Sequence, residues 1–121
     1  MAIANNALAG IAVVELSGEI ATRYCARLFA QYGAQVWRVA AGPEPLDPLF
    51  AAWLDDGKTL TSCADTALAA LGGASAPHKL VVAGQTRDAR AAAEAAVAGR
   101  HPLLTIDWFD PRGAYAARQS A

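Results

Sequence analysis

Residues 8–39, LAGIAVVELSGEIATRYCARLFAQYGAQVWRV, have the pattern of a strand, a helix and a second strand. The run IAVV at 11–14 is short, continuous and apolar, which is typical of a strand buried on both faces of a parallel sheet. Gly33 is placed to end the helix, and residues 34–39 alternate as a second strand would. Such a unit joins two parallel strands through a right-handed crossover.

The helix between these strands is predicted from its spacing. Ser17 is placed to cap its first turn, because a serine hydroxyl accepts hydrogen bonds from free backbone N–H groups. Ile20, Tyr24 and Leu28 then recur every four residues and predict the buried face. Three further residues widen this stripe: Cys25, Phe29 and Tyr32.

Downstream of this unit, strands alternate with helices. We expect strands at 58–62, 79–83 and 103–106, and helices at 66–71 and 88–99. This alternation predicts an α/β fold, with an open, doubly wound, Rossmann-like and mostly parallel sheet covered by helices on both faces. At 121 residues, the chain is expected to form a single domain, 1–121.

Composition excludes several functional classes. Ten basic and eleven acidic residues give a net charge of −1 without any basic run, so neither nucleic acid nor a membrane surface is an expected partner. No signal peptide is recognisable, and a cytoplasmic location is expected. Cys25 and Cys63 are interpreted as buried small residues, and His78 and His101 as structural loop residues. We therefore expect neither a metal nor a resident cofactor.

Several segments carry a family resemblance: LAGI at 8–11, VVELS at 13–17, YCARL at 24–28 and GAQV at 33–36. In this order and at this spacing they resemble the opening of the family III CoA-transferases. That family includes formyl-CoA transferase, carnitine CoA-transferase and the alpha-methylacyl-CoA racemases. Gly57-Lys58 and DWFDPRGAY at 107–115 resemble later segments of the same family.

The resemblance implies coenzyme A or an acyl-CoA as ligand, held by loops at the strand ends. The candidate contacts are Ser17, Ile20, Ala21, Thr22, Lys58 and Arg87. Thr22 and Arg23, however, replace the glycine and proline of the family's A-G-P turn, and Glu19 would oppose a phosphate at the helix start. Lys58 and Arg87 can equally be solvated surface residues. The G-x-G-x-x-G fingerprint is absent, so we expect no dinucleotide.

The family's nucleophile is an aspartate that follows the segment resembled by Gly113-Ala114-Tyr115, and residues 116–121 contain none. The first reading is thus an amino-terminal CoA-binding-type domain or fragment of a family III acyl-CoA transferase, inactive alone. The second is a degenerate, non-catalytic domain serving as a structural or interaction module in a larger protein. The third is an unrelated α/β binding module. The expected partners are the rest of the parent protein or a second copy of the chain.

Overall fold

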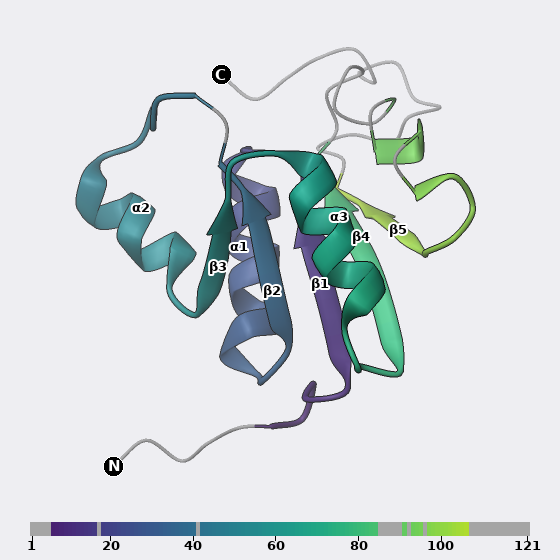
Figure 1. Ribbon diagram of the computed structural model, residues 1–121. Helices are drawn as coiled ribbons and strands as arrows, with labels where there is room; N and C mark the ends of the chain where they lie inside the picture. Colours follow the sequence, from purple (N-terminus) through teal and green to yellow (C-terminus); the bar gives the residue numbers. More distant parts are fainter. Residues whose placement is uncertain are drawn as a thin grey trace, which may run out of the picture.

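The computed structural model describes residues 6–16, 18–40, 42–84, 91, 93–95 and 97–106. The described strands form one sheet in the order β3-β2-β1-β4-β5, and every pairing in it is parallel (Figure 1). The strands are β1 (Ile11–Glu15), β2 (Gln35–Val39), β3 (Lys58–Thr61), β4 (His78–Ala83) and β5 (Leu103–Thr105). The labelled helices are α1 (Ile20–Gln31), α2 (Pro48–Asp55) and α3 (Ala64–Gly73). The predicted α/β fold with an open parallel sheet is confirmed.

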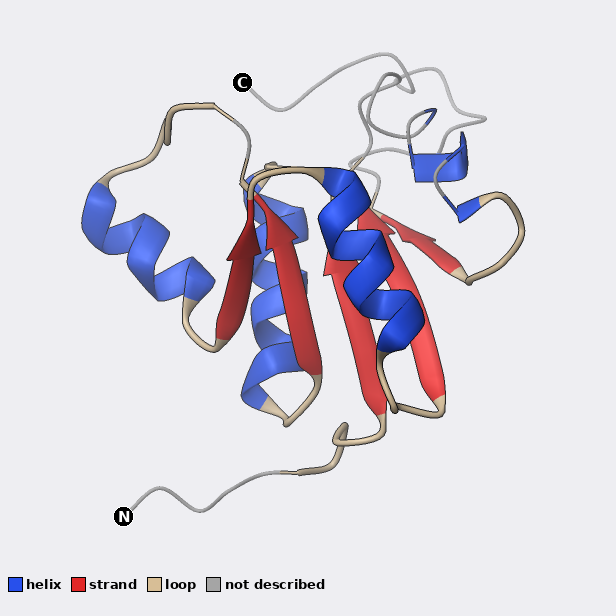
Figure 2. Ribbon diagram, viewed as in Figure 1, coloured by secondary structure: helices blue, strands red, loops and turns tan. Residues whose placement is uncertain are grey.

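The sheet is wound outward from its central strand. From β1 the chain passes through α1 to β2 and on to β3, and α3 then returns it to β4 on the other side of β1. Helices α1 and α3 cover opposite faces of the sheet (Figure 2). The strand order therefore reverses between β1 and β4, which is the place where open α/β sheets usually hold a ligand.

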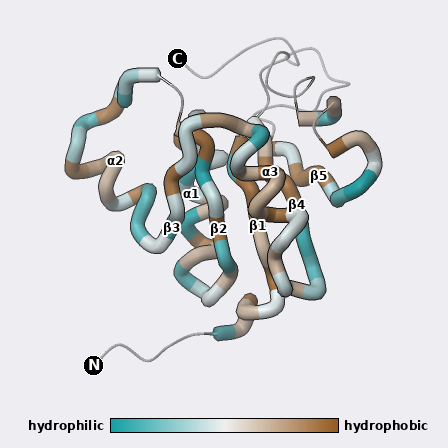
Figure 3. Tube along the Cα trace, viewed as in Figure 1, coloured by the Kyte–Doolittle hydropathy of each residue, from teal (hydrophilic) through white to brown (hydrophobic). Residues whose placement is uncertain are grey.

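Each face of the sheet has its own apolar core. On the α3 face, Ala12 and Val14 of β1 pack with Ala67 and Leu71 of the helix. On the α1 face, Val13 is joined by Val36, Ala26 and other residues. Figure 3 shows β4 changing from hydrophilic at its start to hydrophobic at its end, which matches burial that increases along the strand.

The helix ends follow local chemistry. The Asp47 side chain accepts hydrogen bonds from the backbone N–H groups of Leu49 and Phe50, and Pro48 occupies the first turn of α2. Gly33 follows α1 with a φ of 101°, so the prediction that it ends this helix is confirmed. The cap predicted at Ser17 is wrong in position, because Glu19 is the N-cap residue of α1. Ser17 itself lies outside the described residues.

The predicted buried face of α1 is wrong. Ile20, Tyr24 and Leu28 are 48 %, 45 % and 38 % exposed. The buried residues of α1 are instead Thr22, Arg23 and Ala26. The small side chain of Ala26 packs in the core and lets the helix lie close to the strands.

This rotation turns the apolar stripe toward α2. The Tyr24 ring stacks on Trp53 with a centroid separation of 5.8 Å, and the Arg27 guanidinium lies 4.0 Å from the Trp53 ring. The predicted burial of Cys25 and Phe29 holds in part, since both pack against the core. Tyr32, predicted in the same stripe, is exposed.

Some downstream predictions can be compared only in part. The described residues 91, 93–95 and 97 are helical, as predicted for 88–99. Residues 88–90, 92 and 96 of this range lie outside the described part of the chain. The predicted burial of Cys63 is wrong, because Cys63 is exposed. It is the N-cap residue of α3, and its sulfur lies 3.0 Å from the Thr66 hydroxyl. That contact lowers the pKa of the Cys63 thiol.

Candidate functional site

Charged side chains gather where β1 and β2 end on the α1 face. Glu15 is the last residue of β1 and is paired in register with Arg38 of β2. Because side chains alternate along a strand, these two residues point to the same face as Val13 and Val36. The apolar core on this side therefore gives way to charge at the carboxyl ends of the strands.

The most deeply buried pair joins two distant segments. Lys58, the first residue of β3, places its Nζ 2.7 Å from Glu15 Oε1, and neither side chain is accessible to solvent. The same ammonium group donates to the backbone oxygen of Arg23 at 2.8 Å. Burial raises the pKa of Glu15 and lowers that of Lys58, and their mutual attraction opposes both shifts. Lys58 is thus held inside the protein.

Arg23 is the second buried cation. Its guanidinium donates to both oxygens of Glu44, at 2.8 and 3.0 Å, and to Asp55 at 3.2 and 3.3 Å. Glu44 comes from the loop after β2, and Asp55 ends α2. The hydrogen bond from Arg23 lowers the pKa of the Glu44 carboxyl to about 2. A bidentate arginine–carboxylate pair is among the strongest and most directional polar contacts in proteins.

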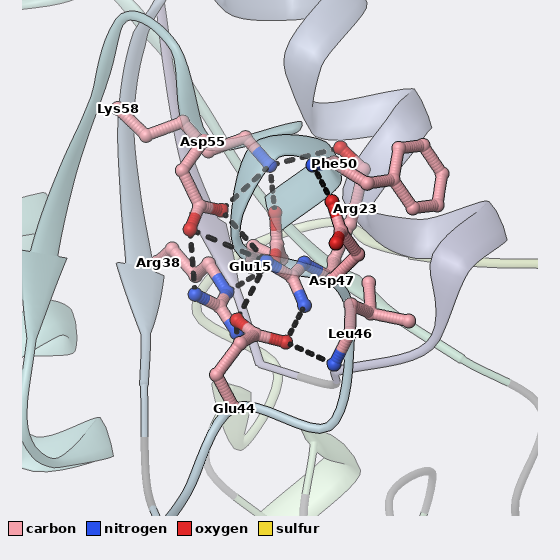
Figure 4. A network of polar contacts seen from close by, with 9 residues as sticks. All are labelled: Glu15, Arg23, Arg38, Glu44, Leu46, Asp47, Phe50, Asp55 and Lys58. Carbon is pink, nitrogen blue, oxygen red and sulfur yellow. Dashed lines mark hydrogen bonds and ion pairs between the residues drawn. The ribbon is translucent and has the colours of Figure 1, made fainter. Parts of the chain in front are cut away.

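Arg38 completes the arrangement. Its guanidinium lies 3.2 Å from Glu15, 2.9 Å from Asp55 and 3.7 Å from Glu44. Three cations and three carboxylates consequently neutralise one another, as Figure 4 shows. We call this set the ion cluster; its members are Glu15, Arg23, Arg38, Glu44, Asp55 and Lys58.

A pocket of about 460 Å³ opens beside the ion cluster. Leu16 and Gly18 of the loop after β1 line one part of it, and Ala40 and Pro43 line another. Arg23, Arg38, Glu44 and Asp55 contribute its polar wall. The pocket thus lies outside the carboxyl ends of β1 and β2, the end of the sheet where α/β folds bind ligands.

An acidic side chain lies at the point where the strand order reverses. Glu19, just before α1, packs so closely on Gly84, just after β4, that a Cβ atom at Gly84 would overlap the Glu19 carboxylate. A negative charge in this position opposes phosphate binding at the start of α1.

The predicted ligand contacts are dispersed. Ser17 and Arg87 lie outside the described residues. Ile20 is exposed on α1, Ala21 is half-buried, and Thr22 is buried. Lys58 is neither a solvated turn residue nor open to a ligand, because it is bound to Glu15. Among the described candidates, the structure does not assemble a cation cradle for a phosphate.

Most of the ion cluster is not among the sequence predictions. Arg23 stands out in the sequence only as a departure from a family pattern, and Arg38, Glu44 and Asp55 are not among the predicted contacts. One signal was present: a charge two residues beyond an inward-facing valine, as in Val13 to Glu15 and Val36 to Arg38, indicates a charge facing the same buried layer. The loop and helix that supply Glu44 and Asp55 carry no comparable periodic signal.

The described residues contain no group of three or more side chains placed to hold a metal ion. In that same part of the chain, no helix has the length and apolar character needed to cross a membrane. Comparisons with protein-family models, with curated proteins and with solved structures found no match to this chain.

Proposed function

We propose that this chain is a Rossmann-like domain of the family III CoA-transferase type that acts as a structural or interaction module. In this proposal it does not by itself transfer CoA between carboxylic acids. One observation carries the argument: the described cations nearest the expected ligand site are paired internally. Arg23, at the position of the family's turn proline, is bound to Glu44 and Asp55, and Lys58 is bound to Glu15.

The resemblance supports the family part of this proposal. Its segments fall on coherent structural positions: VVELS begins within β1, and Gly33-Ala34 leads from α1 into β2. Glu15 and Lys58 come from two separate resembling segments and form the most buried ion pair of the cluster. These segments therefore depend on one another in the fold, as expected of residues that belong to one ancestral pattern.

Exposed apolar side chains support the interaction part. Tyr24 of α1 stacks on Trp53 of α2, which in turn stacks on Phe50, and all three are more than one-third exposed, as is Leu28 of α1. Clustered exposed aromatic and aliphatic groups mark surfaces that contact other proteins. We expect either the rest of a parent protein or a second copy of this chain to cover them.

CoA binding is the second candidate function, favoured by the pocket of about 460 Å³ at the carboxyl ends of β1 and β2. One buried group of its wall, Arg23 Nε, has no hydrogen-bond partner among the described residues. A ligand that displaced Glu44 could use it. Each contact between Arg23 and an anionic ligand would then replace an existing contact with a carboxylate of the protein, so the net gain in affinity is small.

Calorimetric titration of CoA into the purified chain at low salt separates the two candidates. We expect no heat of binding at millimolar CoA, and no transfer from an acyl-CoA to a free carboxylate above the uncatalysed rate. Arg87→Ala removes a cation of the predicted contact set and serves as the comparison variant. High-micromolar binding to the natural protein, or measurable transfer by the chain alone, would contradict the module proposal.

A further inference from the structure

A second pocket, of about 610 Å³, lies at the opposite end of the sheet. Its lining residues come from the beginnings of β1 and β4 and from the segment just before β5. Its basic lining residues are His78 and Lys79 at the start of β4, and Arg100 and His101 just before β5. We call it the basic pocket. None of the described residues that line it is acidic.

The charges of the basic pocket are not neutralised by the described residues. None of its four basic side chains takes part in an ion pair within the described part of the chain, in contrast to every cation of the ion cluster. Lys79 donates one hydrogen bond to the backbone oxygen of Gly72 at 3.0 Å and has further donors to offer. The chain as a whole carries a net charge of −1, so this is a local concentration of positive charge.

The backbone that presents two of these residues is unusual. Ala98 and Gly99 both have positive φ, 47° and 76°, directly before Arg100. For alanine this left-handed conformation is sterically unfavourable. The turn is held by a hydrogen bond of 2.8 Å from the Arg100 N–H to the Val97 oxygen. Strained residues of this kind concentrate at functional positions, and here the turn brings Arg100 and His101 to the pocket.

The remaining walls of the basic pocket are apolar. Ile11 and Leu80 contribute aliphatic side chains, and Pro77 and Pro102 contribute rings without a backbone N–H group. Arginine and lysine supply charge-assisted donors suited to a phosphate group, histidine adds ring N–H donors, and the aliphatic walls suit an organic body attached to the phosphate.

We propose that the basic pocket binds the phosphate group of a small organic phosphate. His78, Arg100 and His101 contact the phosphate oxygens, and Ile11 and Leu80, which share the face of His78, contact the organic part. This site lies at the opposite end of the sheet from the pocket beside the ion cluster and does not depend on the function proposed for the domain.

Titration with phenyl phosphate and with inorganic phosphate, followed by amide chemical shifts at low salt, tests the site. We expect saturable shifts at residues 78–80, 100 and 101 for both probes, with phenyl phosphate binding at least threefold more tightly. Arg100→Gln should weaken binding by about tenfold, and His101→Gln combined with it should weaken binding further. Arg27→Gln removes the same charge from a surface outside the pocket and should change affinity less than twofold.

Three results would overturn the inference. The first is the absence of saturable shifts in the natural protein. The second is an equal loss of binding in Arg27→Gln and Arg100→Gln, which would indicate attraction by overall charge alone. The third is equal affinity for the two probes, which would exclude a role for the apolar walls. Thermal unfolding of each variant, with a midpoint close to that of the natural protein, confirms that the comparison is made between folded proteins.

Discussion

The two faces of the central strand are stabilised in different ways. Ala12 and Val14 point to the α3 face and pack in an apolar cluster that includes the fully buried Leu71. Val13 and Glu15 point to the α1 face, where the apolar core ends in the ion cluster. Apolar burial is non-directional, whereas buried charges must all be placed correctly at once. The stability of the α1 face therefore depends on specific ion pairs, whereas that of the α3 face depends on how much apolar volume is buried.

The largest effect is expected from Lys58→Met, which leaves Glu15 buried without its nearest cation. Loss of one partner of a buried ion pair typically costs about 3–5 kcal/mol of unfolding free energy. Burial already raises the pKa of Glu15, and losing Lys58 removes the attraction that opposes this shift. A group with a raised folded pKa stabilises the fold at low pH and loses that contribution as pH rises, so the deficit should be largest at neutral pH and shrink in acid.

Urea unfolding at several pH values measures this deficit, with Lys79→Met as a matched control in a more accessible strand position. The double variant Glu15→Leu, Lys58→Met retains Arg23 and Arg38 opposite Glu44 and Asp55, so the remaining charges still balance. It should recover most of the lost stability. A double variant no better than Lys58→Met would show that the pair does not act as a unit.

A slightly smaller loss is expected from Leu71→Ala on the α3 face. Leu71 is fully buried, and removal of such a side chain costs about 2–5 kcal/mol through lost apolar burial and a residual cavity. Because no charge is involved, the loss should be the same at neutral and acidic pH. The control is Leu49→Ala on α2, where the side chain is 83 % exposed and the change should be below about 0.5 kcal/mol. A pH-dependent loss in Leu71→Ala would remove the contrast between the two faces.

The sequence predicted the strands well because apolar runs such as 11–14 identify buried parallel strands whatever surrounds them. It failed on α1, since Ile20 and Tyr24 satisfy a helical period yet face α2 and solvent, while Arg23 faces the sheet. Periodicity indicates that a helix has an apolar stripe, but tertiary packing decides which side is buried.

The candidate site was harder to predict than the fold. The ion cluster joins residues up to 43 positions apart, from Glu15 to Lys58. Their partners are determined by the packing of α1 on the sheet and of α2 on α1, which no local pattern records. A buried lysine and a solvated lysine after a glycine have the same local sequence, so only the fold distinguishes them.

The smallest effect is expected from Glu44→Gln at the solvent edge of the ion cluster, where the Glu44 side chain is 31 % exposed. The pKa of Glu44 is lowered from 4.5 to about 2, chiefly by its hydrogen bond from Arg23. A depressed folded pKa means that ionised Glu44 stabilises the fold above the unfolded value, and that this stabilisation is lost as pH falls toward the folded value.

The difference in stability between the natural protein and Glu44→Gln should therefore be constant near neutral pH and shrink between pH 4.5 and about 2. Urea unfolding across this range measures it, and the effect of Glu15 cancels because it titrates in both proteins. Asp56→Asn is the control: Asp56 is 80 % exposed and lies 3.7 Å from Arg27, outside the cluster. If both variants show the same pH dependence, the Glu44 contact is an ordinary surface pair, and the ion cluster contains only its buried members.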